Sequence, residues 1–345
     1  MEVRPIRAWL LHDVTGPEGY ALGETATPAP GPGDVRVALR ASALNHLDLW
    51  VARGMPRPPS LPHVGGADGA GVVDAVGVDV VGIAEGDEVV IDPSTSCGAC
   101  ATCVRGDVPF CAEFAILGEH RWGTHAESVV VPAANVVPKP ERLAWAEAAA
   151  VGLVTSSALR MLRRARLRAG DRMLVIGVGG GTSTAAFLLA RALGAEVFVT
   201  STRHDKLAWA LEHGAAGGFD SSGDFERAVR SATDGRGVDI VVDNVGPTTF
   251  ERSLRSLARG GRLVTNGSTS GRTAELHLPT LFWRQLEVIG ASMNDHREFA
   301  DAVGMIDRGE VDPVPVDSTF PFERFPSALA RLDAGDQLGK IVLER

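Results

Sequence analysis

Short apolar runs, broken by polar and turn residues, dominate the first part of the chain. The runs DVRVALRAS (34–42), GVVDAVG (71–77) and GDEVVIDP (86–93) are rich in Val, and Gly and Pro lie between them. Short runs bounded by turn residues are typical of β-strands joined by tight turns. The pattern predicts a compact all-β domain over residues 1–135.

From about residue 145 the pattern changes to apolar runs that are each followed by an amphipathic segment. DRMLVIGV precedes TSTAAFLLARALG, AEVFVTS precedes RHDKLAWALEHG, GVDIVVDNVG precedes PTTFERSLRSLARG, and GRLVTNGS follows. Strands that alternate with helices form a parallel sheet covered on both faces. The pattern therefore predicts a doubly wound α/β domain over 136–305, and the strand-like GKIVLER predicts that 306–345 return to the first domain.

Composition and charge exclude several classes of partner. The chain has 345 residues, enough for two domains, and its 45% hydrophobic and 22% charged residues are typical of a globular protein. A net charge of −9 argues against nucleic acid and anionic membranes as partners. The most apolar window, 173–195, is broken by glycines and by Arg191, so it does not predict a membrane span. No secretory signal is evident, and the predicted location is the cytoplasm.

The four cysteines of the chain all lie in the segment CGACATCVRGDVPFC (97–111). Disulfides or a metal ion would account for them. Disulfides suit small secreted domains, whereas C-x2-C spacing opens many zinc sites. We therefore predict a zinc lobe over 95–113, with the metal bound by Cys97, Cys100, Cys103 and Cys111. Four thiolates leave no open position for water or substrate, so this zinc is predicted to be structural.

The segment IGVGGGTSTAAFLLARALGA (176–195) places a cluster of glycines between a predicted strand and a predicted helix. This arrangement presents backbone N–H groups to a pyrophosphate at a helix N-terminus. Glycines also serve ordinary tight turns, but the strand–helix units that follow favour dinucleotide binding. The residues predicted to surround the phosphates are Gly179, Gly180, Gly181, Thr182 and Ser183.

The end of the next predicted strand, at Thr200, indicates which dinucleotide binds. NAD sites usually place Asp or Glu there, about 20 residues after the glycine turn, to bind the ribose 2′-hydroxyl. Here Ser201, Thr202 and Arg203 follow the strand, and Lys206 lies one helical turn further on. Hydroxyl and guanidinium groups suit a 2′-phosphate, so these four residues predict NADP(H). The structural alternative is a helix start capped by one of the hydroxyls.

Together these features resemble the medium-chain dehydrogenase/reductase family. The four-cysteine lobe and the segments LPHVGGADGAGVVDAVG (61–77), EAAAVGLVTSSAL (147–159) and LGKIVL (338–343) are similar to its recurrent segments, and the resemblance covers essentially the whole chain. The family includes zinc alcohol dehydrogenases, quinone oxidoreductases and enoyl reductases. It implies a GroES-like β domain, a Rossmann domain, a cofactor in the cleft between them and a homodimer or homotetramer. It also implies a structural zinc on the four cysteines.

The ligands that hold a catalytic zinc in the alcohol dehydrogenases of the family are replaced in this sequence. Asn45 stands where a cysteine is expected, Ala67 where a histidine is expected, and Gly152 where the third ligand is expected. A methyl group and a hydrogen atom cannot bind zinc, and a lone amide is a poor ligand. Leu47 also replaces the first hydroxyl of the proton relay. No catalytic zinc is predicted, and an atypical site that uses Asp68, His46, His63 or His120 is the alternative.

The stretch ALNHLDLWVARG resembles the quinone oxidoreductase branch, which implies hydride transfer to a double bond conjugated with a carbonyl. Asn45 is the predicted hydrogen-bond donor to the carbonyl oxygen, and His46 is a candidate proton donor, although a lone histidine is more often structural. Asp48 would either serve the reaction or brace backbone N–H groups. Residues after the fourth and fifth strands of the α/β domain, and the C-terminal Gly-Lys, are predicted to line the cofactor: Asn244, Asn266, Ser268 and Lys340.

Three functions follow from these features. The favoured one is an NADPH-dependent reductase of enones, quinones or enoyl substrates. The alternatives are an alcohol dehydrogenase with an unrecognised metal arrangement and a non-catalytic NADPH-binding protein. The predicted partners are a small conjugated carbonyl substrate and a second copy of the chain, because the apolar run EVIGASM (287–293) would otherwise form an uncovered edge strand.

Overall fold

The computed structural model describes residues 4–345 and divides into two compact units. The first unit comprises the chain up to Leu153, Asn294–Gly309 and Pro313–Arg345, and the second comprises Val154–Met293 and Glu310–Asp312. The division differs from the expected boundaries, because residues 136–153 and 294–305 belong to the first unit. Of the segment 306–345 that was expected to return to the first domain, residues 306–309 and Pro313–Arg345 lie in the first unit and Glu310–Asp312 in the second.

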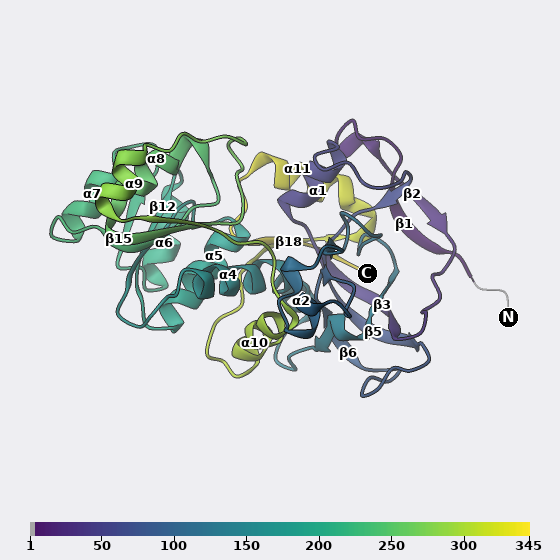
Figure 1. Ribbon diagram of the computed structural model, residues 1–345. Helices are drawn as coiled ribbons and strands as arrows, with labels where there is room; N and C mark the ends of the chain where they lie inside the picture. The colour runs from purple at the N-terminus through teal and green to yellow at the C-terminus, as the bar shows by residue number, and fades with distance from the viewer. Residues whose placement is uncertain (1–3) are drawn as a thin grey trace. The chain divides into compact units, whose positions relative to one another are not determined.

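The first unit is built on a seven-stranded sheet whose neighbouring strands come from distant parts of the sequence. Its order is β10-β6-β5-β3-β18-β17, and β9 also pairs with β3. In Figure 1 the yellow β18 therefore lies beside the purple β3. Valine and leucine side chains from β3, β5 and β9 fill the core under this sheet. The strand bounds are β3 (Asp34–Ala43), β5 (Asp68–Val76), β6 (Glu88–Ile91), β9 (Ser128–Pro132), β10 (Val136–Pro138), β17 (Val316–Pro321) and β18 (Lys340–Glu344).

Smaller elements complete the first unit. A three-stranded sheet has the order β2-β1-β4, and a two-stranded sheet pairs β7 with β8 beside the cysteine lobe. The strands are β1 (Ile6–Leu11), β2 (Tyr20–Thr25), β4 (His63–Val64), β7 (Ser94–Thr95) and β8 (Ala115–Ile116). The helices are α1 (His46–Ala52), α2 (Ala101–Val104), α3 (Trp145–Ala150), α10 (His296–Asp307) and α11 (Phe325–Ala334), with short 3-10 turns η1 (Pro17–Gly19), η2 (Val108–Phe110), η3 (Ala133–Asn135) and η4 (Phe322–Arg324).

The second unit is a parallel six-stranded sheet with the order β13-β12-β11-β14-β15-β16. Its inner strands are continuous apolar runs because helices cover both faces of the sheet, as the sequence pattern predicted. The strands are β11 (Arg172–Val175), β12 (Glu196–Ser201), β13 (Gly217–Asp220), β14 (Val238–Val242), β15 (Leu257–Thr265) and β16 (Glu287–Gly290). The helices are α4 (Gly152–Arg164), which begins in the first unit, α5 (Gly181–Ala192), α6 (His204–Glu212), α7 (Phe225–Ala232), α8 (Pro247–Ser256) and α9 (Leu278–Arg284).

Both predicted fold classes are confirmed: a β domain and a Rossmann-type parallel sheet. In the second unit the strand order reverses between β11 and β14, and ligands of such sheets bind at the carboxyl ends of the strands near that reversal. The glycine turn follows β11, so the sheet places it at that edge. None of the helices within residues 4–345 combines the length and the apolar character that crossing a membrane requires.

Candidate functional site

The four cysteines converge on one point in the lobe that contains α2 and η2. Their sulfur atoms all lie within 4.8 Å of one another, and four of the separations are 3.5–3.8 Å. Four sulfurs at about 2.3 Å from a tetrahedral zinc would be about 3.8 Å apart, so the lobe fits a zinc ion. The Thr102 hydroxyl, and then the backbone of Cys103, lower the pKa of the Cys100 thiol to about 6, whereas the pKa of the neighbouring Cys111 thiol is raised to about 11, so the zinc assignment rests on the sulfur geometry.

Replacing Cys100 with serine should release the zinc. Losing a ligand should weaken zinc binding by more than about 100-fold, since changes to groups behind the ligands already cost about 10- to 100-fold. Elemental analysis of the purified protein should give one zinc per chain for the unaltered protein and less for Cys100→Ser. Thr102→Val is the matched comparison: it removes a hydroxyl 2.9 Å from the Cys100 sulfur but no ligand, so it should weaken zinc binding less than Cys100→Ser does. A full zinc complement in Cys100→Ser would contradict the assignment.

A second polar cluster is buried in the first unit, where three elements begin. Asn45 precedes α1, Asp68 is the first residue of β5, and Lys340 is the first residue of β18. In the β3 register Ala43 pairs with Asp68 on one side and with Val342 on the other, which brings the three residues together. The exposed fraction is 7% for Asn45, 0% for Asp68 and 3% for Lys340.

The three side chains of this cluster are hydrogen-bonded to one another. The Lys340 ammonium donates to Asn45 Oδ1 at 2.6 Å and to Asp68 Oδ2 at 2.8 Å, and Asn45 Nδ2 donates to Asp68 Oδ2 at 2.9 Å. Lysine can only donate and a carboxylate can only accept, so this arrangement fixes which way the Asn45 amide faces. Lys340, expected from the sequence to lie near the cofactor, is thus a direct partner of Asn45, the predicted catalytic residue.

The residues that replace zinc ligands in this sequence make room for that cluster. Asp68 Oδ1 accepts a 2.6 Å hydrogen bond from the backbone N–H of Leu153. A Cβ atom at Gly152 would lie only 2.5 Å from the same oxygen, so a larger side chain there would displace the carboxylate. Ala67 is buried beside Asp68. Within residues 4–345 the four cysteines are the only group of three or more His, Cys, Asp or Glu side chains whose ligand atoms converge.

Asp48 holds the loop that carries Asn45. Its carboxylate accepts from the backbone N–H of Asn45 at 2.7 Å and from that of Gly66 at 3.1 Å. The same carboxylate lies 3.2 Å from Nε2 of the fully buried His125, a residue that the sequence analysis did not single out. Asp48 therefore braces backbone N–H groups, which is the structural role considered for it in the sequence analysis, and one of these groups belongs to Asn45.

His46, the candidate proton donor, is the first residue of α1 and is half-buried. Burial, followed by the positive charge of Lys340, lowers the pKa of the His46 imidazole. The neutral form therefore predominates at pH 7 even more than for an ordinary histidine. Its ring packs near Trp50, with 6.4 Å between the ring centroids.

The glycine turn in the second unit has backbone angles that residues other than glycine rarely adopt. Gly177 and Gly179 adopt φ values of +73° and +108°, which favour glycine. The backbone N–H of Gly179 is bound to the Thr184 hydroxyl at 3.1 Å. Ser183 stands where the family has a glycine, and its hydroxyl donates to the Ile176 carbonyl at 3.0 Å. That hydroxyl is already engaged within the protein, which leaves Thr182 as the better side-chain contact for a phosphate.

The segment after β12 differs in detail from the expectation. β12 continues to Ser201, one residue beyond the predicted end, and the buried Ser201 hydroxyl accepts from the backbone N–H of Arg203 at 3.2 Å. The Arg203 guanidinium binds the Asp205 carboxylate at 2.8 and 3.0 Å, and this contact is the main reason that the pKa of Asp205 falls to about 2. Thr202 is exposed.

Lys206 lies at the glycine turn. It is only 7% exposed, and a Cβ atom at Gly179 would lie 2.3 Å from its Cδ atom. The lysine stem therefore packs directly on this glycine. The positive φ disfavours other residues at Gly179, and a Cβ atom there would also have to push the lysine stem aside.

The ends of β14 and β15 bring together the other predicted cofactor residues. Asn244 Oδ1 accepts from the backbone N–H of Asn266 at 3.0 Å, and the Ser268 Cα lies 3.2 Å from a Cβ built at Gly246. Asp243, which the sequence analysis missed, is 1% exposed and accepts hydrogen bonds from the backbone of this turn and from two hydroxyls of α8. A buried Asp directly after a predicted strand was the available signal.

Comparison with known proteins identifies the family. The model of the alcohol dehydrogenase GroES-like domain matches residues 31–141, and that of the zinc-binding dehydrogenase matches residues 167–308. A zinc-type alcohol dehydrogenase-like protein of Schizosaccharomyces pombe is 31% identical over 352 residues, covering 97% of this chain and 98% of the relative. The chain belongs to the medium-chain dehydrogenase/reductase family.

Members of the family with different names resemble this chain over its full length. Acryloyl-coenzyme A reductase of Metallosphaera sedula is 29% identical over 94% of this chain and 96% of its own length. A solved NAD-dependent alcohol dehydrogenase is 41% identical with a TM-score of 0.95, covering 98% of this chain and 99% of that one. A thermostable alcohol dehydrogenase from Pyrobaculum aerophilum, solved with cobalt and zinc, is 30% identical with a TM-score of 0.90, covering 99% of this chain and 100% of that one.

The family membership makes this chain an oxidoreductase and supports a nucleotide cofactor. It also supports a structural zinc, which the sulfur geometry fits. The names of the relatives include alcohol dehydrogenases and acryloyl-coenzyme A reductases, so the chemistry has to be argued from the residues of this chain.

Proposed function

We propose that the protein is an NADPH-dependent reductase of conjugated carbonyl compounds that works without a catalytic metal. The observation that carries the proposal is the Asn45–Asp68–Lys340 cluster, in which Asn45 stands at one of the three positions that hold zinc in the family's alcohol dehydrogenases. Its carboxylate is already neutralised by an ammonium, and both polar atoms of the Asn45 amide have protein partners. A zinc ion would have to displace Lys340 to reach these ligands, and Gly152 adds none.

The cluster prepares Asn45 to donate a hydrogen bond. Its amide nitrogen carries two hydrogens and the contact with Asp68 uses one of them, so the second is available for a substrate carbonyl. The Lys340 ammonium at Oδ1 draws electron density from the amide and strengthens the N–H as a donor. When bound, the reduced dinucleotide would supply a hydride to the double bond conjugated with that carbonyl. Asn45 would then stabilise the negative charge that develops on the carbonyl oxygen.

His46 is a weak candidate for the proton that completes the reduction. Burial and Lys340 both lower its pKa, so little imidazolium is present at pH 7. We therefore assign that proton to solvent. Asp48 is a positioning residue in this scheme, because it contacts the Asn45 backbone and not the reacting atoms.

The enoyl class of substrate is supported by the acryloyl-coenzyme A reductase relative. Alcohol oxidation is the second candidate, favoured by the 41% identity to a solved NAD-dependent alcohol dehydrogenase. Enoyl reduction and alcohol oxidation require different groups from the protein. Alcohol oxidation needs a group that stabilises an alkoxide, and the metal-ligand and relay positions hold Asn45, Ala67, Gly152 and Leu47.

The deciding experiment compares both reactions on one preparation with known zinc content. We expect NADPH oxidation with enones, quinones or enoyl thioesters, and slower or no reduction of NADP⁺ or NAD⁺ with simple alcohols. Dialysis against a chelator mild enough to leave the cysteine-bound zinc should not change the rate. Faster alcohol oxidation that a chelator abolishes and added zinc restores would refute the proposal. Dinucleotide binding without turnover of any substrate class would favour a non-catalytic role.

Arg203→Ala should weaken the binding of NADPH about tenfold or more while it changes NADH binding little. Only NADPH has the 2′-phosphate, and a hydrogen bond to a charged group contributes about 1.5–3 kcal/mol. Fluorescence titration of both nucleotides measures the effect. Asp205→Ala is the matched control: it removes the carboxylate that binds this guanidinium and should favour NADPH further. Equal affinity of the unaltered protein for NADPH and NADH would contradict the prediction.

We also expect a homodimer that pairs through the edge of the parallel sheet. β16 is the outermost strand and pairs only with β15 among the described residues. Nearby apolar side chains are exposed: Val288 by 41%, Phe282 by 65% and Trp283 by 71%. Light scattering at micromolar concentration should show a dimer or tetramer, and Val288→Lys should shift it toward monomer. Val81→Lys, at a 91% exposed position in the first unit, should have no effect. A stable monomer of the unaltered protein would refute the expectation.

A further inference from the structure

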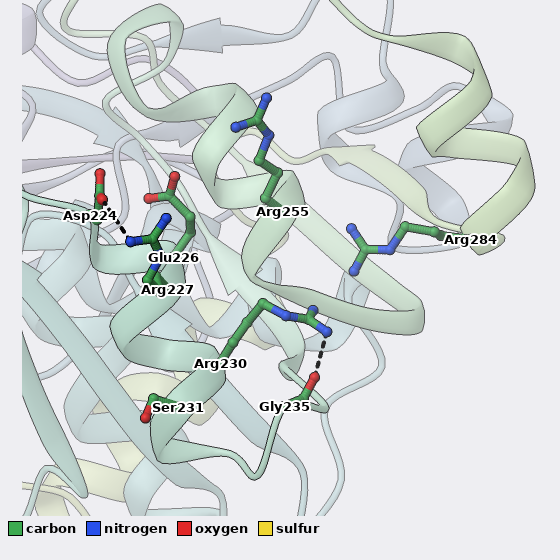
Figure 2. A pocket seen from close by; sticks show the side chains of 8 residues that line it. All are labelled: Asp224, Glu226, Arg227, Arg230, Ser231, Gly235, Arg255 and Arg284. Carbon is green, nitrogen blue, oxygen red and sulfur yellow. Dashed lines mark hydrogen bonds and ion pairs between the residues drawn. The ribbon is translucent and has the colours of Figure 1, made fainter.

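Side chains from three helices of the second unit surround a hollow of about 830 Å³. Figure 2 shows Arg227 and Arg230 on α7, Arg255 on α8 and Arg284 at the end of α9 around it. Asp224 and Glu226 line the same hollow. The glycine turn and the segment Ser201–Lys206 do not line it. Volumes of about 300–1,000 Å³ are typical of small-molecule sites.

Two of the four arginines have no carboxylate partner. Arg227 lies 3.8 Å from Asp224, and Arg255 lies 2.5 Å from Glu251. Arg230 and Arg284 instead donate to backbone carbonyls, those of Gly235 for Arg230 and of Leu254 and Leu257 for Arg284. No carboxylate within residues 4–345 lies within 4 Å of either guanidinium. The hollow therefore has two unneutralised positive charges on a chain of net charge −9.

The positive charges of the Arg230 and Arg284 guanidinium groups repel each other. Partial burial lowers the pKa of Arg284, and repulsion from Arg230 and from Arg259 adds to the effect. In Figure 2 the Arg284 and Arg230 side chains extend toward the same region of the hollow. Like charges held together by helices cost free energy, and a bound anion would remove that cost. Guanidinium groups also match the geometry of phosphate oxygens.

A hydrogen-bond acceptor in the same hollow, the Glu226 carboxylate, indicates which chemical class of anion the hollow would bind. Glu226 Oε2 is buried and has no hydrogen-bond partner among the described residues. Together with Asp224 it forms an acidic side of the hollow, where Arg227 neutralises one carboxylate. A ligand with a phosphate and hydroxyl donors would suit both sides, whereas an acidic peptide would meet carboxylates on one of them.

We propose that this hollow binds a phosphorylated small molecule that also carries hydroxyl groups, such as a nucleoside or sugar phosphate. The phosphate lies between Arg230 and Arg284, and a ligand hydroxyl donates to Glu226. Arg255 adds long-range attraction from α8. This site is separate from the proposed dinucleotide turn, and the inference does not depend on the proposed reaction.

Calorimetric titration of ADP into protein saturated with NADPH tests the proposal. We expect saturable binding that weakens at high salt, since the contacts are partly exposed. Arg230→Gln should weaken ADP binding about tenfold or more, because it removes a charged hydrogen-bond partner of the phosphate. Arg191→Gln is the matched control: it removes one exposed arginine at the end of α5, outside the hollow, and should leave ADP binding unchanged.

Further measurements distinguish binding at this hollow from binding at the dinucleotide site and from non-specific binding of anions. Raising the concentration of NADPH should leave ADP binding intact, and competition between the two nucleotides would show that ADP occupies the dinucleotide site instead. Adenosine should bind far more weakly than ADP, and hexaglutamate should not bind more tightly. Arg230→Lys, which keeps the charge, should retain part of the affinity, so misfolding of one variant does not decide the outcome. No binding of ADP to the unaltered protein, or equal binding to Arg230→Gln, would overturn the proposal.

Discussion

Replacing Asn45 with alanine should reduce turnover of a conjugated carbonyl substrate by about 10- to 1000-fold, the range seen when an oxyanion donor is removed. The affinity for NADPH should change little, because the residues proposed to bind the dinucleotide phosphates lie in the second unit. Asp68 and Lys340 remain in contact after the change, so the fold should be retained. Steady-state rates with NADPH and an enone or enoyl thioester, beside the NADPH dissociation constant, check the expectation.

Asn45→Asp is the informative companion to the alanine variant. It keeps the shape of the side chain and loses the amide N–H, so it should be as inactive as Asn45→Ala if donation to the substrate oxygen is what matters. Activity close to that of the unaltered protein in either variant would remove Asn45 from the mechanism. An equal loss of NADPH binding and turnover would point to a general disturbance of the site.

Replacing Lys340 with methionine should destabilise the protein by about 3–5 kcal/mol, the usual cost of removing one partner from a buried ion pair. Asp68 is 0% exposed and would keep a carboxylate with no countercharge. The backbone N–H of Leu153 and the Asn45 amide would be its only remaining donors in the cluster. Urea unfolding followed by circular dichroism measures the loss.

The double variant Lys340→Met/Asp68→Asn tests the electrostatic cause. It removes both charges and should recover most of the lost stability, since a neutral amide costs far less to bury than a lone carboxylate. Its turnover should stay low, because the Asn45 amide would no longer be polarised by an ammonium. If the double variant is as unstable as Lys340→Met, the loss comes from packing of the lysine stem and not from its charge.

The sequence predicted the features that depend on local spacing. The cysteine segment, the glycine turn after β11 and the alternation of strands and helices each lie within a short stretch, so pattern and chemistry could be read together. The departures at Asn45, Ala67 and Gly152 could also be noticed from the sequence alone. The buried cluster that accompanies these departures could not be predicted, because the partner that neutralises Asp68 is Lys340, 272 residues away in the sequence.

Other details of the site could not be predicted because they depend on which of several possible hydrogen-bond partners a side chain binds in the folded protein. Arg203 has the expected position, but Asp205 two residues later binds its guanidinium. Ser183 replaces a glycine and still fits, because the Ile176 carbonyl accepts its hydroxyl. The spacing of Arg203 and Asp205 was a usable signal. No local pattern indicated that arginines from α7, α8 and α9 surround one hollow, since only the packing of the helices brings them together.

The pairing of β18 with β3 has a consequence for how the protein is made on the ribosome. All six strands of the parallel sheet lie within Val154–Met293, so that sheet can form while the remainder is still being translated. Lys340 is added to the chain 295 residues after Asn45, about 15 to 60 seconds later at about 5–20 residues per second. Throughout that interval one edge of β3 lacks its final neighbour and the Asp68 carboxylate lacks its lysine. The nascent first unit, rather than the second, is therefore where chaperones should be needed.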